Sequence, residues 1–285
     1  MTAEPQYSVD FCEREYNPML AIPNAADIVA GRAERAARAR TGMRAEMNLA
    51  YGEGPLENLD LFLPRGSSRA LLVFIHGGYW RARDKREFSH IAYPFVEAGA
   101  TVAVINYDLC PAVSMEKIVH ECRSAIVWLY RNASRFEAAR DRLYVAGHSA
   151  GGHLTAMMLA SDWPAIDAGM PAKPIRAALA ISGLFDLEPM LFFESLNVDI
   201  RLDAATARRL SPVHLTPHAA APLHLAVGAK ESAEFHRQSR LIRTAWPACA
   251  GEDLSVSGHD HLTVVDEIAA TDSPLFACAR RMMGL

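Results

Sequence analysis

Residues 143–153 read LYVAGHSAGGH, an apolar run that continues into Gly147-His148-Ser149-Ala150-Gly151 and a helix-like stretch. This G-x-S-x-G pattern is typical of a sharp turn between a strand and a helix that presents a nucleophilic serine. Such a turn is tight and strained, so the positions two before and two after the serine have room for almost no side chain. The following helix directs its free N–H groups toward the same point. We therefore interpret Ser149 as a nucleophile rather than a small serine tolerated in a glycine-rich turn.

The composition is that of an ordinary globular protein. The chain has 285 residues, of which 51% are hydrophobic and 22% charged, so we expect a single domain spanning residues 1–285 with a full core. A net charge of −4 provides no basic field for a nucleic-acid partner. No apolar stretch approaches the roughly 18 residues that span a bilayer, so we expect no membrane partner.

Cysteine usage and the N-terminal composition indicate a cytoplasmic protein. The first ten residues are polar and include Glu4, which argues against a signal peptide. The cysteines are odd in number and never form a C-x-x-C pair, which favours reduced thiols over a disulfide framework or a zinc ribbon. They are Cys12, Cys110, Cys122, Cys249 and Cys278.

Apolar runs and helical patterns alternate along most of the chain. The runs are nearly continuous, which is typical of strands buried on both faces of a parallel sheet. Alternation of strand and helix predicts an α/β fold, a mostly parallel open sheet flanked by helices. The predicted strands are 59–63, 70–75, 101–107, 143–146, 177–182, 223–227 and 254–256; the predicted helices are 86–98, 114–131, 152–161, 233–245, 264–270 and 275–283.

Two segments fall outside this alternation. Residues 1–47 have no strand signal and contain a helix candidate at 25–39, which we interpret as a helical lid or brace packed over the sheet. Residues 184–215 are irregular, are rich in Leu, Phe and Met, and follow a strand on the side where such sheets carry ligands. We expect them to form a small helical cap, with loop packing as the alternative. A homodimer is compatible with this segment, and no residue pattern argues for it.

A serine nucleophile requires N–H donors for the oxyanion that forms during acyl transfer. The apolar run 73–75 leads into His76-Gly77-Gly78-Tyr79-Trp80, where glycines allow the backbone to approach a substrate carbonyl. We predict an oxyanion hole from the N–H groups of Gly78 and Tyr79, together with that of Ala150 after the nucleophile. His76 is expected to make structural hydrogen bonds under this loop.

The general base must be a late histidine on a loop after the last strand. Residues 255–262 read SVSGHDHL and offer His259 and His261. His261 directly precedes an apolar run, at the junction where the base is needed, so we favour it. A metal site at His259-Asp260-His261 is the alternative, but no further ligands are evident elsewhere, so we predict no metal and no cofactor.

The acid that orients the base is expected after the strand at 223–227. Glu231 lies just past its end, and Glu234 follows three residues later. We favour Glu231 and keep Glu234 as the alternative. The resulting order along the chain is serine, then carboxylate, then histidine.

Three blocks of this sequence resemble the kynurenine formamidases (arylformamidases), a family of the α/β-hydrolase fold. They are the HGGYW block at 76–80, the GHSAGGHL block at 147–154 and ESAEFHRQS at 231–239, within a similarity that runs from about 58 to 266. Related esterases of the hormone-sensitive lipase type usually carry a third glycine where this chain has Tyr79. The family's usual acid is an aspartate, whereas this chain has Glu231.

The resemblance implies a metal-free serine hydrolase that cleaves aryl N-formyl amides through an acyl-enzyme. Its triad would be Ser149, His261 and Glu231, and its partner a small aryl amide or ester. Three alternatives stay open: a carboxylesterase for short-chain or aryl esters, an amidase for larger N-acyl anilides, and a non-catalytic ligand-binding protein. Candidate substrate-binding residues are Trp80, Phe185, Phe193 and His153.

Overall fold

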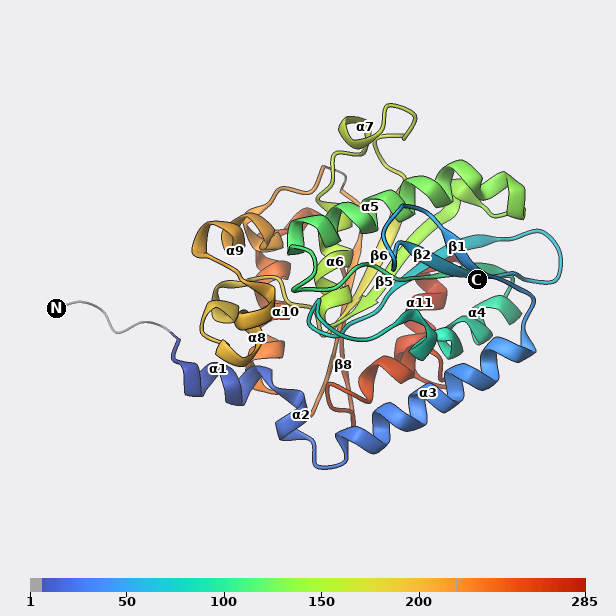
Figure 1. Cartoon of the computed structure of the whole chain (residues 1–285). Coiled ribbons are helices and arrows are strands. Elements are labelled where there is room, and N and C mark those ends of the chain that lie inside the picture. The colour runs from blue at the N-terminus through green and yellow to red at the C-terminus, as the bar shows by residue number, and fades with distance from the viewer. Residues whose placement is uncertain (1–6, 219) are drawn as a thin grey trace.

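The computed structural model describes residues 7–218 and 220–285. Its centre is an eight-stranded sheet in the order β1-β2-β4-β3-β5-β6-β7-β8 (Figure 1). The pairs β1–β2 and β2–β4 are antiparallel and all other neighbours are parallel. The predicted α/β class with a mostly parallel sheet is therefore confirmed. The strands are Ala45–Ala50 (β1), Asn58–Phe62 (β2), Ala70–Ile75 (β3), Ala100–Ile105 (β4), Leu143–His148 (β5), Ile175–Ile181 (β6), Leu223–Gly228 (β7) and Ala250–Val256 (β8).

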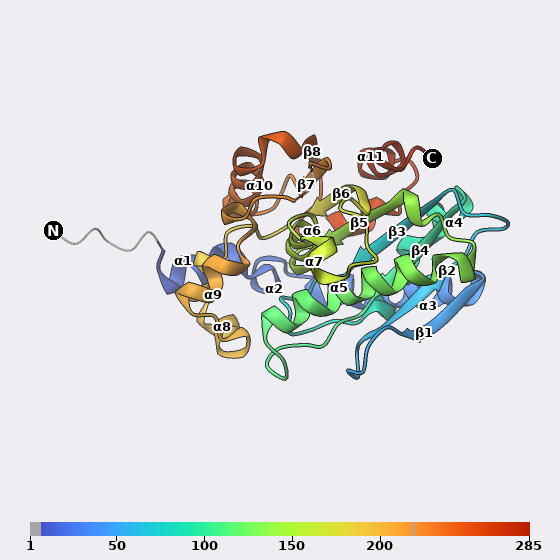
Figure 2. The same cartoon turned by 90° about the horizontal axis from the view of Figure 1, so that it is seen from above.

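Helices cover both faces of this sheet (Figure 2). The α-helices are Val9–Tyr16 (α1), Pro18–Ala21 (α2), Ala25–Gly42 (α3), Ala92–Glu97 (α4), Met115–Asn132 (α5), Ala150–Leu159 (α6), Trp163–Ile166 (α7), Glu194–Ile200 (α8), Ala204–Leu210 (α9), Ala233–Ala245 (α10) and Pro274–Met283 (α11). Short 3-10 helices are Lys85–Glu87 (η1), Ser89–Ile91 (η2), Ala133–Phe136 (η3), Arg140–Arg142 (η4), Glu188–Leu191 (η5), Pro212–His214 (η6), Pro247–Cys249 (η7) and Val264–Ile268 (η8). None of the helices in the described ranges is long and apolar enough to cross a membrane.

Strand β3 shows how the sheet divides the core. All six of its residues are buried, as the continuous apolar run predicts. Side chains alternate along a strand, so Leu71 and Val73 join the core under α5, α6 and α10, whereas Leu72 and Phe74 join the core under α4 and α11. Each such buried side chain contributes about 1.5–3 kcal/mol of hydrophobic stabilisation.

The N-terminal region differs from its prediction. The predicted helix is present as α3, which packs against η1 and η2, but the prediction of no strand before residue 47 was wrong because β1 begins at Ala45. This strand lies at the sheet edge, half its residues are exposed, and Asn48 breaks its register with φ +55°. Such a strand has no apolar periodicity to detect. Residues 1–6 of the predicted lid lie outside the described residues.

Two predicted helices were also wrong in extent or type. The stretch 86–98 forms an α-helix only from Ala92, because Pro94 lacks an N–H group and is tolerated only in a helix's first turn. The stretch 264–270 is the 3-10 helix η8. It ends early because Ser273 donates hydrogen bonds to the carbonyls of Glu267 and Ala270, which turns the chain into α11.

Residues 184–215 form η5, α8, α9 and η6, and α8 lies beside α1 in Figure 1. Arg81 connects this segment to the loop after β3, since its Nη1 lies 2.7 Å from Asp199 Oδ2 and 2.6 Å from the Ser195 carbonyl oxygen. The five cysteines are all buried and unpaired.

Candidate active site

The carboxyl ends of β5, β7 and β8 share one edge of the sheet, and the loops that follow them meet there. Ser149 lies between β5 and α6, with φ +56° and ψ −118°. A Cβ atom at Gly147 would lie 2.2 Å from the Gly151 carbonyl oxygen, and one at Gly151 would lie 2.0 Å from the Ile75 carbonyl oxygen. The two glycines are therefore required by close backbone contacts, and the serine between them is held in a strained conformation.

His261 contacts the nucleophile candidate directly. Its Nε2 lies 3.0 Å from Ser149 Oγ, and its Nδ1 lies 2.6 Å from Glu231 Oε2. The imidazole is buried, and its ring centroid lies 4.2 Å from that of Phe235. Packing on this ring and the two polar contacts together restrict the imidazole to one orientation.

Glu231 is fixed by its second oxygen. Oε1 accepts hydrogen bonds from the hydroxyl of Ser182, at 2.5 Å, and from the N–H of Gly228, at 2.7 Å. Glu234 is engaged elsewhere, since it accepts hydrogen bonds from the Tyr16 hydroxyl at 2.6 Å and from Arg237 Nε at 2.9 Å. Of the two candidate acids, the fold brings Glu231 to His261.

His259 and Asp260 have partners of their own. His259 Nε2 lies 3.5 Å from Glu267 Oε1. Asp260 Oδ1 accepts hydrogen bonds from the backbone N–H groups of Leu262 and Thr263 and stabilises the turn that follows. The side chains of 259–261 therefore do not converge as metal ligands would.

The loop after β3 brings backbone donors close to Ser149. A Cβ atom at Gly77 would lie 3.1 Å from the Ser149 Cβ, so this backbone packs directly on the serine. Gly78 has φ +110° and Tyr79 has φ +49°. Within the described residues, the N–H groups of Gly78, Tyr79 and Ala150 make no hydrogen bond and remain free for a ligand oxygen.

His76 lies under this loop and makes hydrogen bonds there, the structural role expected from the sequence. Its Nδ1 lies 2.7 Å from the Gly77 carbonyl oxygen and its Nε2 lies 3.1 Å from Asn106 Oδ1. Its ring stacks on that of Tyr107 with centroids 4.4 Å apart. Burial lowers the pKa of the His76 imidazole.

The four predicted substrate-binding residues lie in different places. Phe193 lines a cavity beside Ser149, where its ring contacts that of Tyr79 edge to face with centroids 5.6 Å apart. Trp80 and His153 are fully buried and bonded to each other, since Trp80 Nε1 donates to His153 Nδ1 at 3.2 Å. Phe185 is likewise fully buried, in the core at the start of the predicted cap.

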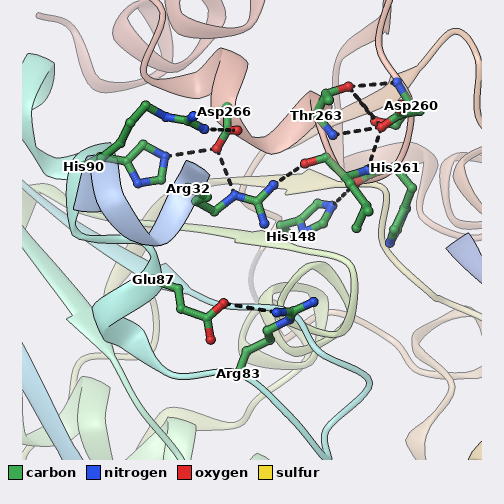
Figure 3. A network of polar contacts seen from close by, with 11 residues as sticks. Arg32, Arg83, Glu87, His90, His148, Asp260, His261, Thr263 and Asp266 are labelled. Carbon is green, nitrogen blue, oxygen red and sulfur yellow. Dashed lines mark hydrogen bonds and ion pairs between the residues drawn. The ribbon is translucent and has the colours of Figure 1, made fainter. Parts of the chain in front are cut away.

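His148, which sequence reasoning treated only as a variable position of the motif, supports the backbone of His261. Its Nε2 donates a hydrogen bond to the backbone carbonyl of His261 at 2.9 Å (Figure 3). Burial, the neighbouring His261 and the Arg32 charge hold the pKa of the His148 imidazole well below its ordinary value. His148 is therefore neutral near pH 7 and suited to this single donated hydrogen bond.

Arg32 is a second contributor that sequence reasoning missed. It extends from α3 between Asp266 and the loop that carries His261 (Figure 3). Its Nε lies 3.0 Å from Asp266 Oδ1, and its Nη2 donates to the Leu262 carbonyl. His90 Nε2 also contacts Asp266, at 3.0 Å. The N-terminal segment thus anchors the loop that carries His261, which lies more than two hundred residues away in the sequence. A single arginine in a sequence gives no sign of a contact that distant.

A strained serine between strand and helix, with a histidine and a carboxylate on later loops of a mostly parallel sheet, defines a hydrolase of the α/β-hydrolase fold. The chain matches the family model described as BD-FAE over residues 59–245. It is 31% identical to the kynurenine formamidase of Danio rerio over 258 residues, which cover 87% of this chain and 85% of that protein. The chain therefore belongs to the kynurenine formamidase family, and the resemblance found in the sequence is confirmed.

Two further comparisons extend this relationship. The chain is 28% identical to the esterase LipQ of Mycobacterium tuberculosis, covering 79% of this chain and 58% of that protein. A crystal structure of a proposed thioesterase from Silicibacter sp. tm1040 matches with a TM-score of 0.82 and 35% identity, covering 93% of this chain and 97% of that one. Formamidase and esterase relatives thus share this fold.

Proposed function

We propose that this chain hydrolyses aryl N-formyl amides through a formyl-enzyme on Ser149. The proposal rests on one arrangement of three side chains. Ser149 Oγ lies 3.0 Å from His261 Nε2, and His261 Nδ1 lies 2.6 Å from Glu231 Oε2. The 31% sequence identity to a kynurenine formamidase, over most of both chains, supports a formamide as the substrate.

In the first half-reaction, His261 Nε2 takes the hydroxyl proton of Ser149 while Oγ attacks the formyl carbon. The oxyanion accepts hydrogen bonds from the N–H groups of Gly78, Tyr79 and Ala150. Collapse of the tetrahedral intermediate breaks the C–N bond, and His261 gives its proton to the departing aryl amine. A formyl ester of Ser149 remains.

In the second half-reaction, His261 takes a proton from water, whose oxygen attacks the formyl ester. Collapse returns the proton to Ser149 Oγ and releases formic acid. Glu231 keeps the proton of the neutral imidazole on Nδ1 and stabilises the imidazolium in both halves. The buried hydrogen bonds of Glu231 to Ser182 and Gly228 keep its carboxylate in place for this role.

Two structural segments support binding of a small aryl substrate. Tyr79 and Phe193 provide aromatic surface beside Ser149. Phe193 comes from residues 184–215, which we propose as the cap, and Asn17 and Pro18 of the N-terminal segment, proposed as the lid, line the same cavity. The five unpaired thiols fit a cytoplasmic location, which we also propose.

A carboxylesterase is the second candidate, because the esterase LipQ and the proposed thioesterase are also relatives. An anilide amidase would use the same residues, and a non-catalytic binding protein would leave Ser149 unreactive. The test is kcat/KM for N-formyl-L-kynurenine beside p-nitrophenyl acetate and an N-acetyl anilide, with Ser149→Ala as control. A clear preference for the formamide that the variant abolishes supports the proposal. Ester turnover without formamide turnover reassigns the protein as an esterase, and activity on acetyl and formyl amides alike indicates the broader amidase.

A further inference from the structure

The Asp, Glu, Lys and Arg side chains that line the cavity beside Ser149 are all arginines. It is lined by Ser149 and His261 together with three arginines, Arg32, Arg81 and Arg83. Among the described residues that line it there is no aspartate or glutamate. Guanidinium groups are costly to place in a partly dry cavity, and an anionic ligand offsets that cost. The triad chemistry uses none of the three.

The carboxylates that pair with these arginines stand outside the cavity. Arg81 Nη1 is held by Asp199 and by a backbone carbonyl, so Arg81 anchors residues 184–215 rather than facing a ligand. Arg83 Nη1 lies 3.2 Å from Glu87 Oε2. The Nε and Nη2 of Arg83 make no hydrogen bond within 7–218 and 220–285.

Arg83 is held in position from two sides. It has φ +80°, and its Cγ lies 2.6 Å from where a Cβ atom at Gly78 would be, so its stem packs against a proposed oxyanion donor. Glu87 is itself fixed, because its Oε1 accepts a hydrogen bond from the N–H of Asp84. A strained residue with an oriented side chain at a reaction centre is consistent with a ligand-binding role.

Arg32 provides a second charge on this cavity. Its side chain is 3% exposed, with its guanidinium 5.5 Å from the ring centroid of Phe88. Nε and Nη2 are engaged by Asp266 and by the Leu262 carbonyl, whereas Nη1 has no hydrogen-bond partner among the described residues. Both Arg32 and Arg83 lower the pKa of His148, the residue before the nucleophile, so both charges act close to the reacting atoms.

We propose that Arg83, together with Arg32 on the same cavity, forms a carboxylate-binding subsite that selects substrates whose leaving group carries a carboxylate. This inference rests on the proposed function, because a formyl group has no substituent and recognition must act on the leaving group. A guanidinium with two free donors matches a carboxylate in geometry as well as charge. A neutral aryl substrate leaves those donors unpaired.

The experiment uses esters, so that it does not depend on formamide cleavage. The full-length enzyme is assayed with 3-acetoxybenzoate and 4-acetoxybenzoate, each beside its neutral methyl ester. The wild type is expected to favour the anionic member of at least one pair in kcat/KM. In Arg83→Gln this ratio falls about 10- to 100-fold, mainly through KM, as expected for loss of a charge-assisted hydrogen bond. Arg83→Lys keeps the positive charge but lacks the planar pair of N–H donors, so it retains part of the preference for the anionic ester.

The matched control is Arg86→Gln, three residues further on in η1, because the Arg86 side chain is 69% exposed and pairs only with Asp84 among the described residues. This variant is expected to keep the wild-type ratio. No anionic preference in the wild type, or an unchanged ratio in Arg83→Gln, overturns the subsite. If formamides are not cleaved but the ester ratio responds to Arg83, the subsite stands and the proposed function fails. Formamide turnover without any charge preference supports the proposed function and overturns the subsite.

Discussion

The imidazole of His148 donates a hydrogen bond to the backbone carbonyl of His261, at 2.9 Å. The residue before Ser149 therefore holds the backbone of the residue that contacts Ser149. The loop of His261 is anchored on its other side by Arg32, through the Leu262 carbonyl. Two side chains that form hydrogen bonds with neither the Ser149 hydroxyl nor the His261 imidazole thus hold the backbone that carries His261.

Removing the His148 donor is expected to lower kcat. In His148→Phe, the buried carbonyl of His261 loses its hydrogen-bond donor, which costs about 1–3 kcal/mol. Because this lets His261 shift away from Ser149, we expect kcat to fall roughly 10- to 100-fold. His148→Gln keeps an N–H donor and should recover part of the activity. Steady-state kinetics with one ester measure both. Equal kcat values in the two variants would show that the hydrogen bond donated by His148 does not contribute to turnover.

Replacement of Ser149, the proposed nucleophile, tests the site most directly. Ser149→Ala should reduce turnover on the order of 10⁶-fold, as in other complete triads. The wild type should also be labelled covalently by a fluorophosphonate probe, with the modification located on Ser149 by peptide mass spectrometry. Labelling at another serine, or turnover retained by the alanine variant, would contradict the proposed mechanism.

The two candidate acids are distinguished by paired variants. Glu231→Gln keeps the shape of the side chain but removes the negative charge that keeps the proton of His261 on Nδ1, so kcat should fall by about 10⁴. Glu231→Asp retracts the carboxylate from a 2.6 Å contact by one methylene and should give an intermediate loss.

Glu234→Gln is the matched control for this pair. Glu234 accepts hydrogen bonds from Tyr16 and Arg237 and should affect stability by about 1–3 kcal/mol rather than kcat. Chemical denaturation measures that effect. A loss of kcat in Glu234→Gln as large as that in Glu231→Gln would show that this distinction is wrong.

Local rules explain which parts of the fold and site were predictable. The G-x-S-x-G turn depends on backbone contacts of Gly147 and Gly151 that allow almost no other residue, so its sequence carries its geometry. Glu231 was found because a carboxylate just past a buried strand must lie at the same sheet edge as Ser149. Strand β1 was missed because an exposed edge strand with a break at Asn48 has no apolar pattern.

Contacts between distant segments were not predictable in this way. Arg32 appears in the sequence as one of several arginines on an amphipathic helix. Its side chain is buried because α3 packs against η1 and η2, where its guanidinium lies over Phe88 and reaches Asp266. Trp80 was expected to form an aromatic wall of the substrate pocket, but with φ +56° its side chain lies in the core and donates to His153. A single residue's direction after a strained turn depends on tertiary packing, which a sequence pattern does not encode.

His153 is expected to make the folded protein sensitive to acid. Burial lowers the pKa of this histidine to about 4, against an ordinary value of 6.5. Its Nδ1 accepts a hydrogen bond from Trp80 and its Nε2 donates to the Leu210 carbonyl, so an added proton on Nδ1 would face an N–H donor. Between pH 6.5 and 4 the unfolded chain binds a proton here that the folded chain does not, so the free energy of unfolding falls as the pH drops through this window.

The contribution of this residue reaches about 3 kcal/mol at the acid end of the window. His153→Gln removes the titrating group, so its free energy of unfolding should decrease less between pH 6.5 and pH 4 than that of the wild type. Part of the decrease remains, because burial also lowers the pKa values of His76 and His148. Urea denaturation at a series of pH values measures the two curves. Since the shorter glutamine side chain also loses packing, the slope rather than the absolute stability is the test, and parallel curves would refute the assignment.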